Sequence, residues 1–94
     1  MGKEITLENR DRLVQLGITI AVIRKMRGLS QEQLAEKANV SRTFIGYIEA
    51  PGLVKDFTVG ALFAIADALD VNAADLIGES EFPDRIINKG IKKS

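Results

Sequence analysis

Apolar residues in the first third of the chain recur at intervals of three and four positions. The members of this series are Leu13, Leu16, Ile20 and Ile23. Because a helix brings such positions onto one face, the pattern predicts a helix from about Leu7 or Asn9 to Arg27. The β-branched residues within this segment would also suit a strand, but the flanking charges and the spacing favour the helix. Gly28 follows, and a residue free to adopt positive φ is typical of a helix end.

Two serines are placed to start the next two helices. Ser30 and Gln33 have the spacing of a capping box, in which each side chain accepts a hydrogen bond from the other residue's backbone amide. The second helix is expected to run to about Ala38. Ser41 is then expected to cap a third helix over residues 42–49, which is ended by the Pro-Gly pair soon after it.

The second half of the chain carries two more apolar-faced segments. Thr58 is placed to cap the first of them. Its inward positions are Leu62, Ile65, Ala66 and Leu69. Asn72 is placed to cap the second, in which Leu76 and Ile77 are expected to turn inward. Because no Asn-Gly or Asp-Gly hairpin signal occurs, the expected fold class is all-α, a compact bundle of five short helices.

Residues 1–78 are interpreted as one domain, and residues 79–94 as a C-terminal tail that is either a short helix or disordered. The apolar residues of the tail suit packing on the core of the same chain as well as contact with a second copy. Met26 and Phe63 are expected to lie in the core because they are large and apolar.

The composition removes several classes of chemistry. The chain has no histidine and no cysteine, so it lacks the commonest zinc ligands, the usual general base at neutral pH and any disulfide. It also has no phosphate-binding loop and no dinucleotide fingerprint. We therefore expect no metal site, no cofactor and no enzymatic activity. Apolar stretches such as residues 17–23 are far shorter than the roughly 20 residues that span a bilayer, so no membrane association and a cytoplasmic location are expected.

The charges balance over the whole chain but not within its parts. Lysine and arginine together number 13, as do aspartate and glutamate. A nucleic-acid-binding domain is expected to show a basic face, so this balance counts against that function. However, residues 20–49 hold five basic and three acidic residues, whereas residues 50–80 hold one basic and five acidic residues. The local field of the first segment matters more to a polyanionic partner than the sum over the chain.

The joint between the second and third expected helices has a specific geometry. Residues 31–50 would form two short helices joined by a brief turn. Ala35 is small enough to let the helices cross closely, Asn39 tolerates the left-handed backbone region, and Val40 fills the turn from inside. Such a pair holds the second helix at a steep angle to the first, which leaves its outer face free to enter a DNA major groove.

The segment LSQEQLAEKANVSRTFIGYIEA, with LFAIADALDVNAADLI further on, resembles the Cro and phage-repressor-like (Xre-type) helix-turn-helix family. The resemblance extends from about Leu16 to Ile77. It implies a lambda-repressor-like domain and a homodimer that binds a palindromic operator in double-stranded DNA and regulates transcription. It also implies an ion pair between Arg24 and Glu49, either exposed and of little energetic value or buried and able to orient the recognition helix.

The resemblance makes residues 42–49 the recognition helix and implies that the first residue of the preceding helix contacts a phosphate. The expected DNA-binding residues are Gln31, Ser41, Arg42, Thr43, Gly46, Tyr47 and Lys55. Three features depart from the family pattern. The turn position that is most often glycine is Asn39, the loop after the recognition helix is slightly long and holds a single basic residue, and a glycine lies on the base-reading face. Gly46 would either let the backbone approach DNA or reduce the number of base contacts.

Arg42 is the residue best suited to identify a base. Its guanidinium can donate two hydrogen bonds to guanine O6 and N7, a pairing worth roughly 1–3 kcal/mol of discrimination. Thr43 would place its methyl group on thymine or its hydroxyl on phosphate, and Tyr47 suits a sugar or backbone contact. Simpler alternatives are Arg42 as a solvated helix residue, Gln31 as part of a capped turn, and Tyr47 packed on the following loop.

Two functions from different classes remain after these arguments. The favoured one is a sequence-specific transcriptional regulator, such as a repressor, a restriction-modification controller or an antitoxin-like autoregulator. The alternative is a protein-interaction adaptor or toxin-neutralising partner that keeps the fold with little DNA binding. The zero net charge and the glycine on the base-reading face support this alternative.

Overall fold

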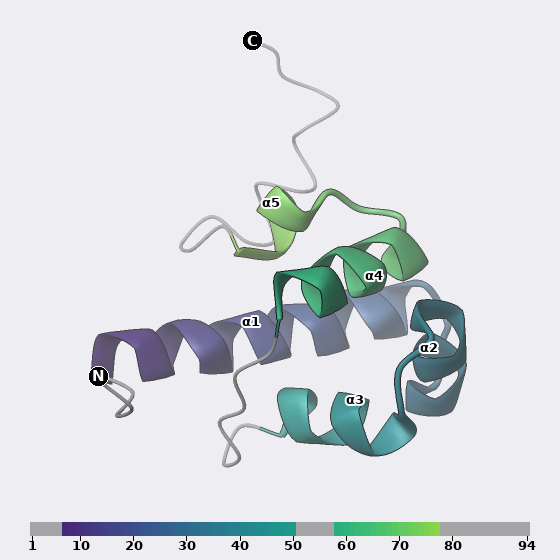
Figure 1. Cartoon of the computed structure of the whole chain (residues 1–94), viewed down its shortest axis with the longest axis horizontal. Coiled ribbons are helices and arrows are strands. Elements are labelled where there is room, and N and C mark those ends of the chain that lie inside the picture. Colours follow the sequence, from purple (N-terminus) through teal and green to yellow (C-terminus); the bar gives the residue numbers. More distant parts are fainter. Residues whose placement is uncertain (1–6, 51–57, 78–94) are drawn as a thin grey trace, which may run out of the picture.

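The computed structural model describes residues 7–50 and 58–77, and over these residues all its regular structure is helical (Figure 1). The elements are α1 (Leu7–Met26), α2 (Gln31–Ala38), α3 (Arg42–Glu49), α4 (Val59–Leu69) and α5 (Ala73–Ile77). The predicted all-α bundle of five short helices is therefore confirmed. The first helix ends at Met26, one residue before the expected Arg27.

Several local signals for helix ends are also confirmed, at Gly28, Ser30 and Thr58. Gly28 has a φ of 75°, in the left-handed region. Ser30 Oγ accepts a hydrogen bond from the Gln33 amide at 3.0 Å, and Gln33 Oε1 accepts one from the Ser30 amide at 2.8 Å. Thr58 Oγ1 accepts from the Ala61 amide at 3.1 Å at the start of α4. Each of these bonds satisfies an amide that has no partner within its helix.

One hydrophobic core joins the described helices. α1 packs on α3 and α5, α2 packs on α3 and α4, and α4 packs on α5. The buried apolar side chains are Leu16, Ile20, Ile23, Leu34, Ala35, Ala38, Ile45, Ile48, Ile65, Ala66, Leu69 and Leu76. Since every described helix contributes to this set, the position of α3 depends on the packing of the whole bundle.

Three apolar residues that were expected to face inward are exposed. The exposed fraction is 63% for Met26, 55% for Phe63 and 55% for Ile77. Met26 and Phe63 lie beside the buried stripe of their helix and not within it. Ile77 follows the buried Leu76, and successive residues of a helix point about 100° apart. Helical periodicity thus located the buried stripes, whereas residue type alone misplaced these side chains.

The Arg27 guanidinium, just after α1, forms hydrogen bonds with the C-terminal end of α4. Arg27 Nε donates to the Leu69 carbonyl at 2.8 Å, and Nη2 donates to the Asp70 carbonyl at 3.2 Å. Carbonyls at the end of a helix lack partners within it and favour a cation. This contact therefore ties the end of α1 to the end of α4.

Within the described ranges, no helix combines the length and the apolar character that a membrane span requires. The same ranges contain no group of acidic side chains arranged to hold a metal ion. The expected tail, residues 79–94, and the loop residue Lys55 lie outside the described residues. The division into a domain of residues 1–78 and a tail stays a prediction.

Candidate nucleic-acid interface

The turn between α2 and α3 has the backbone that the sequence predicts. Asn39 adopts φ 59° and ψ 44°, in the left-handed region. The Val40 amide donates to the Ala35 carbonyl at 2.9 Å, which satisfies a carbonyl in the last turn of α2. Ser41 Oγ accepts a hydrogen bond from the Phe44 amide at 3.0 Å and so starts α3. These local bonds fix the direction in which α3 leaves α2.

α3 buries one face and exposes the other. Ile45 and Ile48 point into the core and are only 0% and 6% exposed. The outer side of the helix and its start are formed by Ser41, Arg42, Thr43, Gly46 and Tyr47, all exposed except the half-buried glycine. The structure therefore brings five of the residues expected to bind DNA onto one surface.

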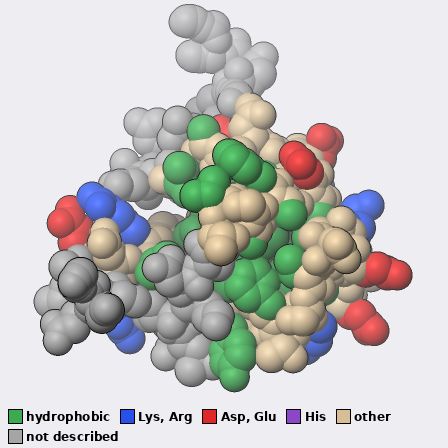
Figure 2. Space-filling model, viewed as in Figure 1, with side chains coloured by type: hydrophobic (Ala, Val, Ile, Leu, Met, Phe, Trp, Pro, Cys, Tyr) green, Lys and Arg blue, Asp and Glu red, His purple; other side chains and the backbone are tan. Residues whose placement is uncertain are grey.

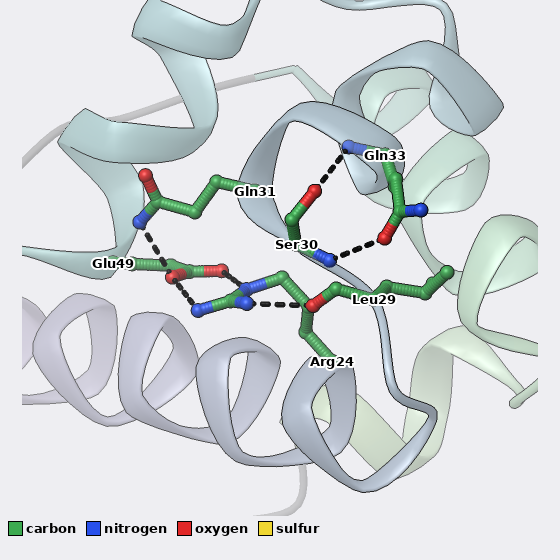
Figure 3. A network of polar contacts seen from close by, with 6 residues as sticks. All are labelled: Arg24, Leu29, Ser30, Gln31, Gln33 and Glu49. Atoms are coloured by element: carbon green, nitrogen blue, oxygen red, sulfur yellow. Dashed lines mark hydrogen bonds and ion pairs between the residues drawn. The ribbon is translucent and has the colours of Figure 1, made fainter.

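A buried ion pair holds the C-terminal end of α3 against α1 (Figure 3). Arg24 Nε and Nη2 donate to the two carboxylate oxygens of Glu49 at 2.8 Å and 3.0 Å. The remaining nitrogen, Nη1, donates to the Leu29 carbonyl at 2.7 Å. The two side chains are 10% and 5% exposed, so this is the buried arrangement and not the exposed one. A two-pronged contact of this kind has a fixed geometry and orients the helix that carries the carboxylate.

Gln31 joins the same network from the start of α2 (Figure 3). Its Nε2 donates to Glu49 Oε1 at 2.9 Å, so one carboxylate accepts hydrogen bonds from both α1 and α2. Sequence reasoning assigned Gln31 to a phosphate and did not foresee this contact. The two residues are 18 positions apart, and only the crossing of the helices brings them together.

Gly17 allows α1 and α3 to approach each other closely. A Cβ built at Gly17 would lie far inside van der Waals contact of the Ile48 carbonyl oxygen, and 3.1 Å from the carbonyl carbon of the same residue. It would also lie 3.7 Å from the Glu49 Cα. The missing side chain therefore sets the separation of the two helices. Sequence analysis did not single out Gly17, although a glycine inside an apolar helical segment was a signal for close packing.

The outer face of α3 carries one charge, that of Arg42. The other charged residue of this helix is Glu49, whose side chain is buried and paired with Arg24. The surface offered by α3 is therefore basic, although the chain as a whole has no net charge. A local positive charge of this kind suits a polyanion.

Comparison with known proteins relates this geometry to a family. Residues 20–76 match the helix-turn-helix family. Over 64 residues the chain is 41% identical to the immunity repressor protein of Bacillus phage phi105. The match covers 68% of this chain and 43% of the repressor, so the chain spans less than half the length of that relative.

Solved structures give the same relationship. The restriction-modification controller protein C.AhdI from Aeromonas hydrophila is similar with a TM-score of 0.64 and 30% identity, over 68% of this chain and 94% of the controller. A complex of the SinR and SinI proteins gives a TM-score of 0.64 and 28% identity, over 81% of this chain and 79% of the matched chain. This chain belongs to the helix-turn-helix family of the Cro and phage-repressor (Xre) type, a family of non-enzymatic, DNA-binding regulators of transcription.

Proposed function

We propose that this protein is a cytoplasmic regulator that binds a palindromic operator in double-stranded DNA as a homodimer and controls transcription, with α3 in the major groove. The observation that carries the proposal is the outer face of α3, which is exposed and basic while its inner face and its end are fixed by the core and by Glu49. A helix held in this way is preorganised to enter the groove. The similarity to a phage repressor and to a restriction-modification controller supports the same function.

Within this proposal the residues divide between bases and phosphates. Arg42 reads guanine through two parallel donors, and Thr43 contacts an adjoining base or its phosphate. Gln31 binds a phosphate with the second proton of its Nε2, since the first is donated to Glu49. The remaining contacts, with the sugars and phosphates of the DNA backbone, are made by Ser41, Gly46, Tyr47 and Lys55.

A selection from a random DNA pool with the purified protein, with binding isotherms at several salt concentrations, tests this proposal. Arg42→Ala is expected to relax discrimination at one position of each half-site by about 1–3 kcal/mol. Gln31→Ala is expected to weaken binding to all sequences alike, and because the lost side chain is neutral the salt dependence should stay unchanged. Lys25→Ala, which removes an exposed cation from α1, is the control and should leave base preference unchanged. Full base preference in Arg42→Ala would show that α3 is not the reading element.

A palindromic operator has two half-sites about 34–36 Å apart, and each half-site binds one copy of α3. Because one chain carries a single α3, the proposed operator requires a homodimer. Exposed apolar side chains on α4 and α5 offer a surface for a second copy: Val59, Phe63 and Ile77 are 63%, 55% and 55% exposed. Figure 2 shows hydrophobic side chains gathered over these two helices. Sedimentation equilibrium of the purified protein should give the mass of two chains, and a monomer at operator-binding concentrations would contradict this part of the proposal.

A second candidate function is protein interaction, which the same exposed apolar residues favour. The similar SinR/SinI structure is a complex of two different proteins. In that case this chain would act as an adaptor or as a neutralising partner. Co-purification of a partner protein, together with no gel shift at low salt on any genomic DNA, would favour this function over the first.

A further inference from the structure

Gly46 lies at the centre of the outer face of α3, one helical turn after Arg42. Residues four positions apart are neighbours on a helix surface, so a side chain at position 46 would border that of Arg42. A Cβ built at Gly46 would lie 3.4 Å from Arg42 Nη1 and 3.9 Å from Gln31 Oε1. Two polar groups, one from each helix of the motif, therefore lie within 4 Å of the place a Cβ would take at this glycine.

The path of the Arg42 side chain depends on the space at Gly46. Helical side chains incline towards the N-terminus of their helix. The guanidinium of Arg42 instead reaches the glycine one turn towards the C-terminus. A side chain longer than a methyl group at position 46 would compete for the volume that Nη1 occupies. Glycine is also a poorer helix former than alanine, so the stability of α3 alone does not favour it there.

Gln31 is fixed on the other side of the same glycine. Its Nε2 donates to Glu49 Oε1 at 2.9 Å (Figure 3). A carboxylate accepts hydrogen bonds and does not donate them, so the amide nitrogen must face Glu49 and Oε1 must face away from it. The buried ion pair thus determines that the oxygen of Gln31 is the atom presented near Gly46 and the Arg42 guanidinium.

We infer that Gly46 is a specificity-determining residue, which acts by positioning Arg42. With no side chain at position 46, the guanidinium lies over the middle of α3 beside Gln31 and contacts a guanine opposite the centre of the helix. A larger residue displaces the guanidinium towards the start of α3 and so moves or abolishes the guanine preference. The inference rests on the proposed function, because it concerns how the same surface selects its DNA sequence.

The test compares variants of the full chain in the random-pool selection, with melting temperatures measured in parallel. Gly46→Leu introduces a good helix former without a polar group that could replace the guanidinium. It is expected to lower the guanine preference at the position identified by Arg42→Ala by roughly 5- to 150-fold, the range for one bidentate contact. Gly46→Ala, whose Cβ would only touch Nη1, is expected to give a smaller loss. Neither variant is expected to melt below the wild type.

Two controls separate positioning from a general effect of the substitution. Gly60→Leu places the same residue on α4, where the nearest atom to a Cβ is Thr58 Oγ1 at 3.8 Å, and base preference should be unchanged. Gly46→Leu combined with Arg42→Ala should show the guanine preference of Arg42→Ala alone, because the glycine affects that preference only through the Arg42 guanidinium.

An unchanged guanine preference in both Gly46→Leu and Gly46→Ala would overturn the role of Gly46 and leave DNA binding by α3 intact. A further loss of guanine preference in the double variant would overturn it as well, since Gly46 would then act without Arg42. If the wild-type chain enriches no sequence from the pool, the proposed function fails and this inference fails with it.

Discussion

Gly17→Ala adds one methyl group where α1 packs on α3. The new Cβ would overlap the Ile48 carbonyl oxygen and lie 3.1 Å from the carbonyl carbon. Ile48 is buried, and the atoms that meet the methyl group belong to the backbone, so they cannot rotate away as a side chain would. The substitution must therefore push α3 away from α1.

Two opposed effects set the size of the change. Alanine in place of glycine inside a helix gains about 1 kcal/mol. An extra methyl group in a packed interface costs about 1–3 kcal/mol, and the upper end applies here because backbone must move. The expected net loss in the free energy of unfolding is about 2 kcal/mol. In a domain of this size such a loss lowers the melting temperature by roughly 8–16 °C.

Gly46→Ala is the matched control, because the same substitution in another helix meets only side-chain ends, those of Arg42 at 3.4 Å and Gln31 at 3.9 Å, and no backbone. It is expected to raise the free energy of unfolding by about 0.5–1 kcal/mol. Urea titrations followed by circular dichroism measure both variants against the wild type. If Gly17→Ala is as stable as Gly46→Ala, the close approach of α1 and α3 does not limit what position 17 can hold, and the reasoning is refuted.

Two further changes test the joint around α3. Glu49→Ala leaves the Arg24 guanidinium buried without its carboxylate, so urea unfolding should show a loss of about 3–5 kcal/mol. The double variant Arg24→Met, Glu49→Leu should lose less, and equal losses would argue against an uncompensated charge as the cause. Asn39→Ala forces alanine into the left-handed region and should cost about 1 kcal/mol, whereas Asn39→Gly should not. Thermal unfolding checks this pair, and an unaffected Asn39→Ala would contradict the turn geometry.

The helix ends and the turn could be predicted from sequence because their chemistry is local. A serine cap such as Ser30 or Ser41 needs only an amide three residues further on. The left-handed turn at Asn39 is accessible to few residue types. The outer face of α3 was implied by the resemblance to the helix-turn-helix family, and the structure buries Ile45 and Ile48 on the inner face of the same helix.

Contacts between distant segments could not be predicted in this way. The hydrogen bond from Gln31 to Glu49 and the approach of Gly17 to Ile48 exist only because the bundle places α2, α1 and α3 together. The side chain of Met26 was misplaced for a different reason. Large apolar residues are buried on average, but the position of each residue relative to the buried stripe decides its exposure.

The Arg24–Glu49 ion pair is shielded from solvent, and this affects how the protein responds to ionic strength. Dissolved ions screen a shielded pair of charges weakly, whereas phosphate contacts on an exposed surface weaken steeply as salt is added. Concentrated salt should therefore release the protein from DNA well before it separates the three helices that meet at this ion pair. Molecules released in this way would keep α3 in its bound orientation and rebind as soon as the salt is diluted.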